Sequence, residues 1–204
     1  EPELAQLRFR LPELPMRAAE ADFESGDRTF RAGSFVIDAT LDDRLRDVVD
    51  ELGLELVAVN APPDVPMHEL PTPRIAIVHN WSSTQSEGWY RYAFDDLGIP
   101  FDYISIQDVR TTSDFAERYD VVLLAPGFGN ANQIIHGFPG EDPVPWETSE
   151  LTPNLGVIDS SPDIRSGLGY EGLLHLQEFV RSGGLLVAVT SSANFAINTG
   201  LAPF

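Results

Sequence analysis

The chain has 204 residues, of which 43% are hydrophobic and 22% charged, enough for one large domain or for a domain preceded by a smaller module. Its 32 acidic residues outnumber 13 basic ones, and the net charge of −19 disfavours binding to nucleic acid phosphates or to anionic lipid surfaces. No apolar run approaches the roughly 18–20 residues of a membrane span, so we expect no membrane insertion.

The chain contains no cysteine, which excludes disulfides, thiolate metal sites and a cysteine nucleophile. The four histidines do not follow the spacings of zinc-binding motifs, so no metal or other cofactor is expected in this chain. The compartment is left open, with a secreted or periplasmic bacterial protein as one alternative. Self-association into a homo-oligomer is also left open.

Residues 1–60 are predicted to form a small α/β module. A short helix is expected over 17–26, followed by a hairpin or one bent strand over 29–38. A helix over 41–53 is indicated by apolar residues at helical spacing, acidic residues in its first turn and Gly53 at its end. Residues 54–60 are expected to form a strand. The segment 61–73, with five prolines in thirteen residues, is predicted to be a linker or an extended connector.

Residues 74–204 alternate between apolar strands and amphipathic helices. Strands are predicted at 74–80, 101–106, 120–127 and 185–189, and helices at 113–119 and 170–184. A further helix is predicted to begin at a capping box formed by Thr84 and Glu87 and to end at Gly98. The helix ending at Gly98 is expected to pack through Trp89, and Glu87 to cap it. Residues 128–169 are predicted to be a long loop, either a lid or an interface, that carries Trp146.

This order of elements predicts an α/β fold with a doubly wound, mostly parallel sheet of the flavodoxin-like or amidotransferase-like kind. Ligands of such sheets bind beyond the carboxyl ends of the strands. Three loops are expected there, at 79–85, 125–132 and 190–194, and they define a candidate cleft that includes Trp81, Gly127, Gly129 and Ser192.

Two segments resemble class I glutamine amidotransferases. DVVLLAPGFG (120–129) is similar to the strand and glycine turn that supply the oxyanion hole of that family. GGLLVAVTSSANFA (183–196) is similar to its nucleophile elbow, but the usual Gly-x-Cys-x-Gly pattern is replaced by Ala188, Thr190 and Ser192. The resemblance implies an elbow in which Thr190 takes the place of the cysteine.

A more extensive resemblance covers most of the chain. GDRTFRAGSFVI (26–37), VPMHELPTPRIAIVHNW (65–81) and EGWYRYAFDDLGIPFDYIS (87–105) are similar to the amidotransferase-like segment that follows the catalytic domain in some bacterial zinc carboxypeptidases of the carboxypeptidase A type. The resemblance implies that the parent protein is a peptidase. It also implies that zinc belongs to an upstream peptidase domain, and that this domain is the partner of the present chain. The resemblance to class I amidotransferases in turn implies that the histidine and glutamate of that family, which follow the elbow, are expected beyond residue 204.

Two classes of function follow from these patterns. The first is a non-catalytic accessory or interaction domain. The second is a hydrolase that uses the hydroxyl of Thr190 or Ser191, with His79 or His136 as the base. Binding of a small ligand in the candidate cleft is a third alternative. Hydrogen bonding of the three hydroxyls of residues 190–192 to nearby backbone groups is the simplest explanation of their presence.

Overall fold

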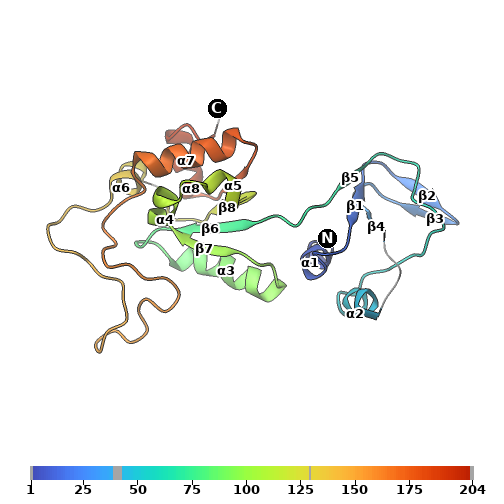
Figure 1. Ribbon diagram of the computed structural model, residues 1–204, viewed down its shortest axis with the longest axis horizontal. Helices are drawn as coiled ribbons and strands as arrows, with labels where there is room; N and C mark the ends of the chain where they lie inside the picture. Colours follow the sequence, from blue (N-terminus) through green and yellow to red (C-terminus); the bar gives the residue numbers. More distant parts are fainter. Residues whose placement is uncertain (1, 39–42, 129, 203–204) are drawn as a thin grey trace. The chain divides into compact units, whose positions relative to one another are not determined.

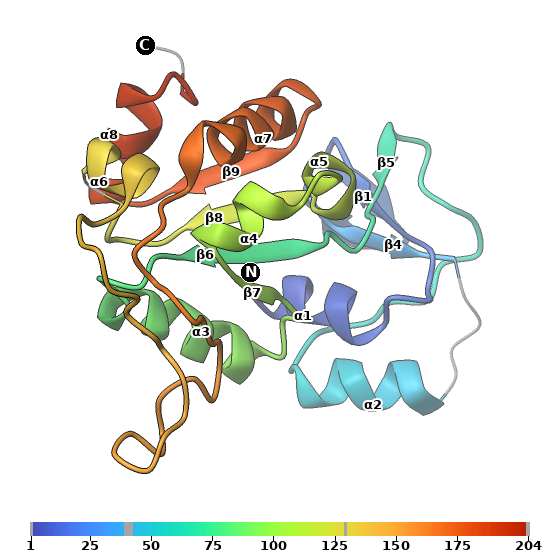
Figure 2. The same ribbon diagram turned by 60° about the vertical axis from the view of Figure 1, so that its left-hand side comes forward.

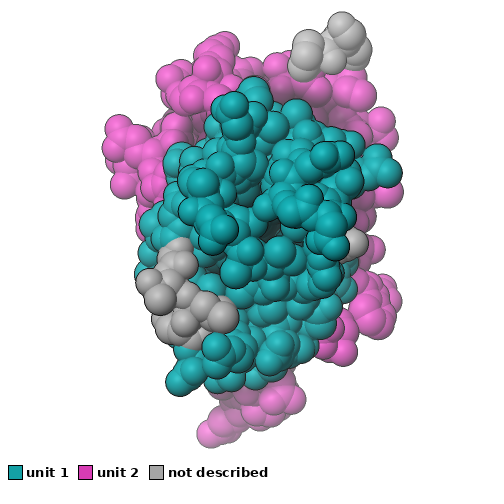
Figure 3. Space-filling model, turned by 90° about the vertical axis from the view of Figure 1, so that its right-hand side faces the viewer, with its two compact units in different colours: residues 1–72, 97–99 teal, residues 73–96, 100–204 magenta. Residues whose placement is uncertain are grey.

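The computed structural model describes residues 2–38, 43–128 and 130–202. They divide into two compact units, residues 1–72 with 97–99 and residues 73–96 with 100–204, which Figure 3 colours separately. Each unit has its own cluster of buried apolar side chains.

The first unit is a small α/β module (Figure 1). Its central strand β1 (Met16–Ala19) pairs antiparallel with β4 (Phe35–Ile37) on one side and with β5 (Met67–Glu69) on the other. Strands β2 (Phe23–Ser25) and β3 (Arg28–Phe30) form a separate antiparallel hairpin. The helices are α1 (Pro2–Arg10) and α2 (Asp43–Glu51).

The core of the first unit is built from apolar residues of both helices and of β1. Leu45 and Val49, one helical turn apart on α2, are buried together with Leu7, Leu11 and Met16. The predicted helix over 41–53 is therefore confirmed for the part that the structure describes, since residues 41 and 42 lie outside the described residues.

Several predictions for the first unit are wrong. The helix expected over 17–26 is replaced by strands β1 and β2, because pairing with two neighbouring strands outweighs the helical propensity of an alanine-rich segment. The segment 29–38 contributes its two strands to different sheets. Residues 54–60 form no strand. The predicted linker or extended connector at 61–73 contains the short strand β5, which pairs with β1, and the boundary between the two units falls between residues 72 and 73.

The second unit is an α/β domain around a four-stranded parallel sheet. The strands are β6 (Ile75–His79), β7 (Asp102–Ser105), β8 (Val121–Leu124) and β9 (Leu185–Ala188), in the order β7-β6-β8-β9. All three pairings are parallel, as the predicted fold class requires. The four predicted strands are confirmed.

Helices cover both faces of this sheet. Figures 1 and 2 show α3 (Gln85–Leu97) on one face, and α4 (Ile106–Thr111), α5 (Phe115–Arg118) and α7 (Gly169–Arg181) on the other. The remaining helices are α6 (Ala131–His136) and α8 (Ser191–Asn198). The chain is thus a doubly wound α/β fold preceded by a small module. No helix of the described part is long and apolar enough to cross a membrane.

The core of the second unit lies on the face of α7. Alternate strand residues point to opposite faces of a sheet, and Val78, Val122 and Leu124 pack there against Phe115 and Phe179. The opposite face carries Ile77 and His79 of β6 toward α3. Here the prediction for α3 is wrong, because Trp89 is 71% exposed and Glu87 is the buried residue of the helix.

Candidate functional site

Strand β9 leads into helix α8 through a sharp turn at Thr190. Its backbone has φ 51° and ψ −112°, and it is the one non-glycine residue with positive φ among those that the structure describes. Nucleophile elbows place their reactive residue on such a strained turn between a strand and a helix. The local geometry of an elbow is therefore present, with the side chain of Thr190 exposed to solvent.

The two serines that follow Thr190 are hydrogen-bonded to the glycine turn after β8. The Ser191 hydroxyl accepts a hydrogen bond from the Gly127 N–H at 3.0 Å. The Ser192 hydroxyl, which is fully buried, accepts from the Phe128 N–H at 3.3 Å and donates to the carbonyl oxygen of Ala125. Backbone N–H groups of such a turn are the donors that an oxyanion hole requires. Here those donors already have internal acceptors.

The glycine turn itself lies close to the loop after β6. Gly127 has φ 131°, and a Cβ atom added there would lie 2.9 Å from the side chain of Ser83. Glycine is therefore required at this position both by the backbone and by the contact. Gly129, the other glycine of the candidate cleft, lies outside the described residues.

The two histidines considered as bases are not bonded to the elbow. His79 is buried at the end of β6, and its Nε2 lies 2.7 Å from Oδ2 of Asp159. His136 is exposed at the end of α6 and packs its ring edge-to-face against Tyr170. No hydrogen bond between described residues connects either histidine with Thr190 or Ser191. The structure therefore does not assemble the predicted nucleophile and base.

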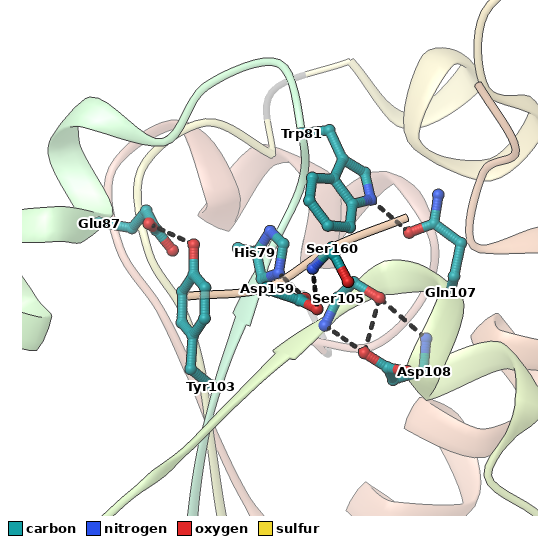
Figure 4. Close-up of polar contacts among 9 residues, drawn as sticks. All are labelled: His79, Trp81, Glu87, Tyr103, Ser105, Gln107, Asp108, Asp159 and Ser160. Carbon is teal, nitrogen blue, oxygen red and sulfur yellow. Dashed lines mark hydrogen bonds and ion pairs between the residues drawn. The ribbon is translucent and has the colours of Figure 1, made fainter. Parts of the chain in front are cut away.

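A second group of residues surrounds a cavity beside α3, which we call the α3 cavity (Figure 4). Its volume is about 200 Å³, and its walls are the ends of β6 and β7, the first half of α3, Trp146 and the segment 154–159. The rings of His79 and Tyr103 stack with centroids 4.2 Å apart, and Trp81 meets His79 edge-on at 4.7 Å.

Polar contacts fix the walls of the α3 cavity. The Tyr103 hydroxyl donates to Oε1 of Glu87 at 2.7 Å, which corrects the prediction that Glu87 caps its helix. The Trp81 indole N–H donates to the side-chain oxygen of Gln107 on α4 at 2.6 Å. Asp159, whose other oxygen accepts from the Ser160 N–H, connects the long loop to β6 through His79. Figure 4 marks these contacts as dashed lines between the labelled side chains.

Burial changes the acid–base behaviour of the residues around this cavity. Desolvation lowers the pKa of His79, and the hydrogen bond and charge of Asp159 oppose that change only in part. Desolvation likewise raises the pKa of Glu87, against the effects of the Tyr103 hydroxyl and the Arg91 guanidinium. Burial and the neighbouring Glu87 raise the pKa of Tyr103 well above its ordinary value. His79 is therefore neutral near pH 7, and its Nε2–H group donates a hydrogen bond to the carboxylate of Asp159.

Of the predicted cleft residues, Gly127 and Ser192 both belong to the contact between the glycine turn and the elbow, Gly127 through Ser191 and Ser192 through Phe128, whereas Trp81 lines the α3 cavity. No sequence pattern connects Tyr103, Arg91 or Asp159 with a site. Tyr103 was recognisable only as a strand residue, and Asp159 lies in the long loop, which carries no periodic pattern. Among the described residues, no group of three or more His, Asp or Glu side chains could hold a metal ion.

Comparisons with known proteins add no relative for this chain: no family model, no curated protein and no solved structure matches it. The geometry of the elbow and of the α3 cavity, together with the sequence patterns, therefore carries the functional proposals.

Replacing Thr190 with glycine is expected to stabilise the protein. Positive φ with a β-branched side chain costs about 1–3 kcal/mol, whereas the extra freedom of glycine in the unfolded chain costs about 0.5–1 kcal/mol. Urea unfolding should therefore show a gain of about 1 kcal/mol for Thr190→Gly. Thr190→Ala, which keeps a Cβ atom, is the control and should show no such gain. A loss of stability in Thr190→Gly would contradict the strain at this turn.

His79 is expected to lower the stability of the protein between pH 7.5 and pH 5.5, whereas the raised pKa of Glu87 acts in the opposite direction. The folded-state pKa of His79 is depressed, so below the unfolded value of about 6.5 the unfolded chain binds a proton that the folded protein does not bind. Its contribution is complete above that pH and is lost as the pH falls toward the folded pKa, at no more than about 1.4 kcal/mol per pH unit.

The measurement is the difference in urea-unfolding free energy between the two pH values. His79→Gln should reduce this difference, whereas His136→Gln, at an exposed histidine of the same unit, should leave it unchanged. An equal pH dependence in the wild type and His79→Gln would show that another group is responsible.

Proposed function

We propose that this chain is a non-catalytic, amidotransferase-like accessory or interaction domain of a zinc carboxypeptidase-like protein. In this function its elbow is a structural connection between β9 and the glycine turn. Zinc and peptide hydrolysis would belong to an upstream domain, against which this chain would pack as a partner.

The hydrogen bonds of Ser191 and Ser192 are the observation that carries the non-catalytic part of this proposal. An oxyanion hole works through N–H donors that are free to bind the developing charge. The N–H groups of Gly127 and Phe128 instead donate to serine hydroxyls at 3.0 and 3.3 Å. A substrate oxyanion would have to displace both hydroxyls, one of which is fully buried.

Within the described part of the chain no base is hydrogen-bonded to Thr190 or Ser191, which also supports the proposal. A threonine or serine hydroxyl is a weak nucleophile unless a base accepts its proton. His79 is already bonded to Asp159, and His136 contacts Tyr170. The peptidase part of the proposal is supported by the sequence resemblance of residues 26–37, 65–81 and 87–105 described above.

A hydrolase with Thr190 as nucleophile is the second candidate. One observation favours it: Thr190 is exposed and holds the strained backbone conformation that elbows give to their reactive residue. A covalent probe for hydroxyl nucleophiles distinguishes the two candidates, because only a working elbow reacts with it.

The peptidase part of the proposal is tested by determining the coding sequence on both sides of residues 1–204. We expect an upstream His-x-x-Glu motif and a distant second histidine, the ligand pattern of a zinc carboxypeptidase. An upstream region without such ligands, together with a downstream His and Glu pair, would contradict the accessory function and favour the hydrolase.

A further inference from the structure

The α3 cavity has the size and walls of a site for a small organic molecule. At about 200 Å³ it is somewhat larger than the engineered protein cavities of roughly 150 Å³ that bind benzene. Trp81 and Trp146, with ring centroids 6.0 Å apart, form two adjacent aromatic walls, and Tyr103 forms a third. Pockets of this kind hold the apolar part of a ligand, while a few polar groups set its orientation.

Glu87 and Arg91, of opposite charge, line the same cavity, and each has one buried polar atom without a hydrogen-bond partner among the described residues. Glu87 is 2% exposed, and no described residue hydrogen-bonds its Oε2, although Oε1 is bonded to Tyr103. Nε of Arg91 is buried without a partner as well, while its guanidinium lies 4.2 Å above the Tyr103 ring. The two residues are four positions apart on α3 and so lie on one face of the helix.

Buried polar atoms without a hydrogen-bond partner are costly to a fold. A buried polar atom without a hydrogen bond destabilises the folded state by about 1–3 kcal/mol, and a charged one by more. Such a cost is typical of binding sites, where a ligand supplies the missing partner. Here one missing partner is a hydrogen-bond donor with positive charge, for Glu87, and the other is an acceptor with negative charge, for Arg91.

We propose that the α3 cavity binds a free α-amino acid with an aromatic or large aliphatic side chain. The ammonium group pairs with Glu87, the carboxylate pairs with Arg91, and the side chain lies against Trp81 and Trp146. A free amino acid is the molecule that presents both charges a few ångströms apart. The amino-terminal residue of a peptide lacks the carboxylate, and the carboxy-terminal residue lacks the ammonium group.

This site is separate from the elbow. The described residues that line the cavity include neither Thr190 nor Ser191, and the glycine turn at 125–128 does not contribute to its walls. Amino acid binding here and catalysis at the elbow can therefore succeed or fail independently of each other.

Isothermal titration of the wild-type chain with L-phenylalanine tests the proposal, with tryptophan fluorescence as a second signal because Trp81 and Trp146 line the cavity. Phenethylamine, which lacks the carboxylate, and 3-phenylpropionate, which lacks the ammonium group, should each bind at least about tenfold more weakly. The dipeptide Phe-Ala should also bind at least about tenfold more weakly. Equal affinity for the dipeptide would overturn the assignment to a free amino acid. The absence of any heat or fluorescence change up to about 10 mM phenylalanine would overturn the site itself.

A pair of tryptophan variants places the binding in the cavity. Trp146→Ala removes an aromatic wall and should weaken phenylalanine binding at least about tenfold, whereas Trp89→Ala, on the exposed side of α3, should leave it unchanged. Glu87→Gln removes the charge and should weaken binding to a similar extent, with its far-ultraviolet circular dichroism checking the fold. Equal effects of the two tryptophan changes would overturn the placement, even if Glu87→Gln fails to fold.

Discussion

Replacing Ser192 with alanine is expected to lower the free energy of unfolding by about 3 kcal/mol. The Ser192 side chain is fully buried and serves two backbone groups, the N–H of Phe128 and the carbonyl of Ala125. Alanine leaves both without a partner in the core beside the glycine turn, and each unsatisfied buried group costs about 1–3 kcal/mol. Urea unfolding of the variant measures the loss.

Ser191→Ala is the matched control for this experiment. Ser191 is the preceding residue of the same helix, it is only half-buried, and it accepts one hydrogen bond, from Gly127. Its loss should therefore cost about 1 kcal/mol, because water can reach the freed N–H group. If Ser191→Ala proved the more damaging change, the structural function assigned to the buried hydroxyl would be wrong.

Replacing Gly137 with alanine is expected to cost at least about 3 kcal/mol, the second large effect. Gly137 ends α6 with φ 77°, and a Cβ atom there would lie only 1.9 Å from the carbonyl oxygen of Arg165. That carbonyl accepts from the Phe138 N–H at 2.9 Å, and Leu168 N–H donates to Ile134 at 2.8 Å nearby. These bonds hold together the two ends of the loop that carries Trp146 and Asp159, so the variant should also weaken phenylalanine binding.

Gly183→Ala separates this steric contact from backbone strain. Gly183 has a similar positive φ of 97°, but a Cβ atom there meets nothing within 4 Å. Its substitution should cost only the conformational strain, about 1–2 kcal/mol. Equal losses of unfolding free energy in the two variants would show that the close approach of Gly137 and Arg165 is not present in solution.

The sheet of the second unit could be predicted because its strands follow a simple physical pattern. A parallel sheet covered on both faces requires continuous apolar strands, and the runs at 74–80, 120–127 and 185–189 are of this kind. The short helices α4, α6 and α8 were missed, because a helix of six to eight residues contains too few turns to show a period. In the first unit, sheet pairing between distant segments decided the structure of residues 17–26.

The elbow was predicted in outline, since a glycine pair, an apolar strand and small residues mark a strand that turns sharply. The positive φ of Thr190 agrees with that prediction. The partners of the serines could not be predicted, because the turn at 125–128 lies more than sixty residues earlier in the sequence.

The α3 cavity depends on contacts that the sequence does not reveal. Glu87 resembles a helix cap, since it stands three residues after Thr84, yet its carboxylate turns to Tyr103 on the neighbouring strand. Asp159 reaches His79 across eighty positions. A buried acid on a helix next to aromatic residues is evident only when the strands have been placed side by side.

The most direct test of the non-catalytic elbow is reaction of the folded chain with a fluorophosphonate probe, followed by intact-mass spectrometry, with a known serine hydrolase treated in parallel. We predict no added mass on the wild-type chain, because the N–H groups of Gly127 and Phe128 are occupied and no base among the described residues is hydrogen-bonded to Thr190. Stoichiometric labelling that disappears in Thr190→Val or in Ser191→Ala would contradict this account and establish a working hydroxyl nucleophile.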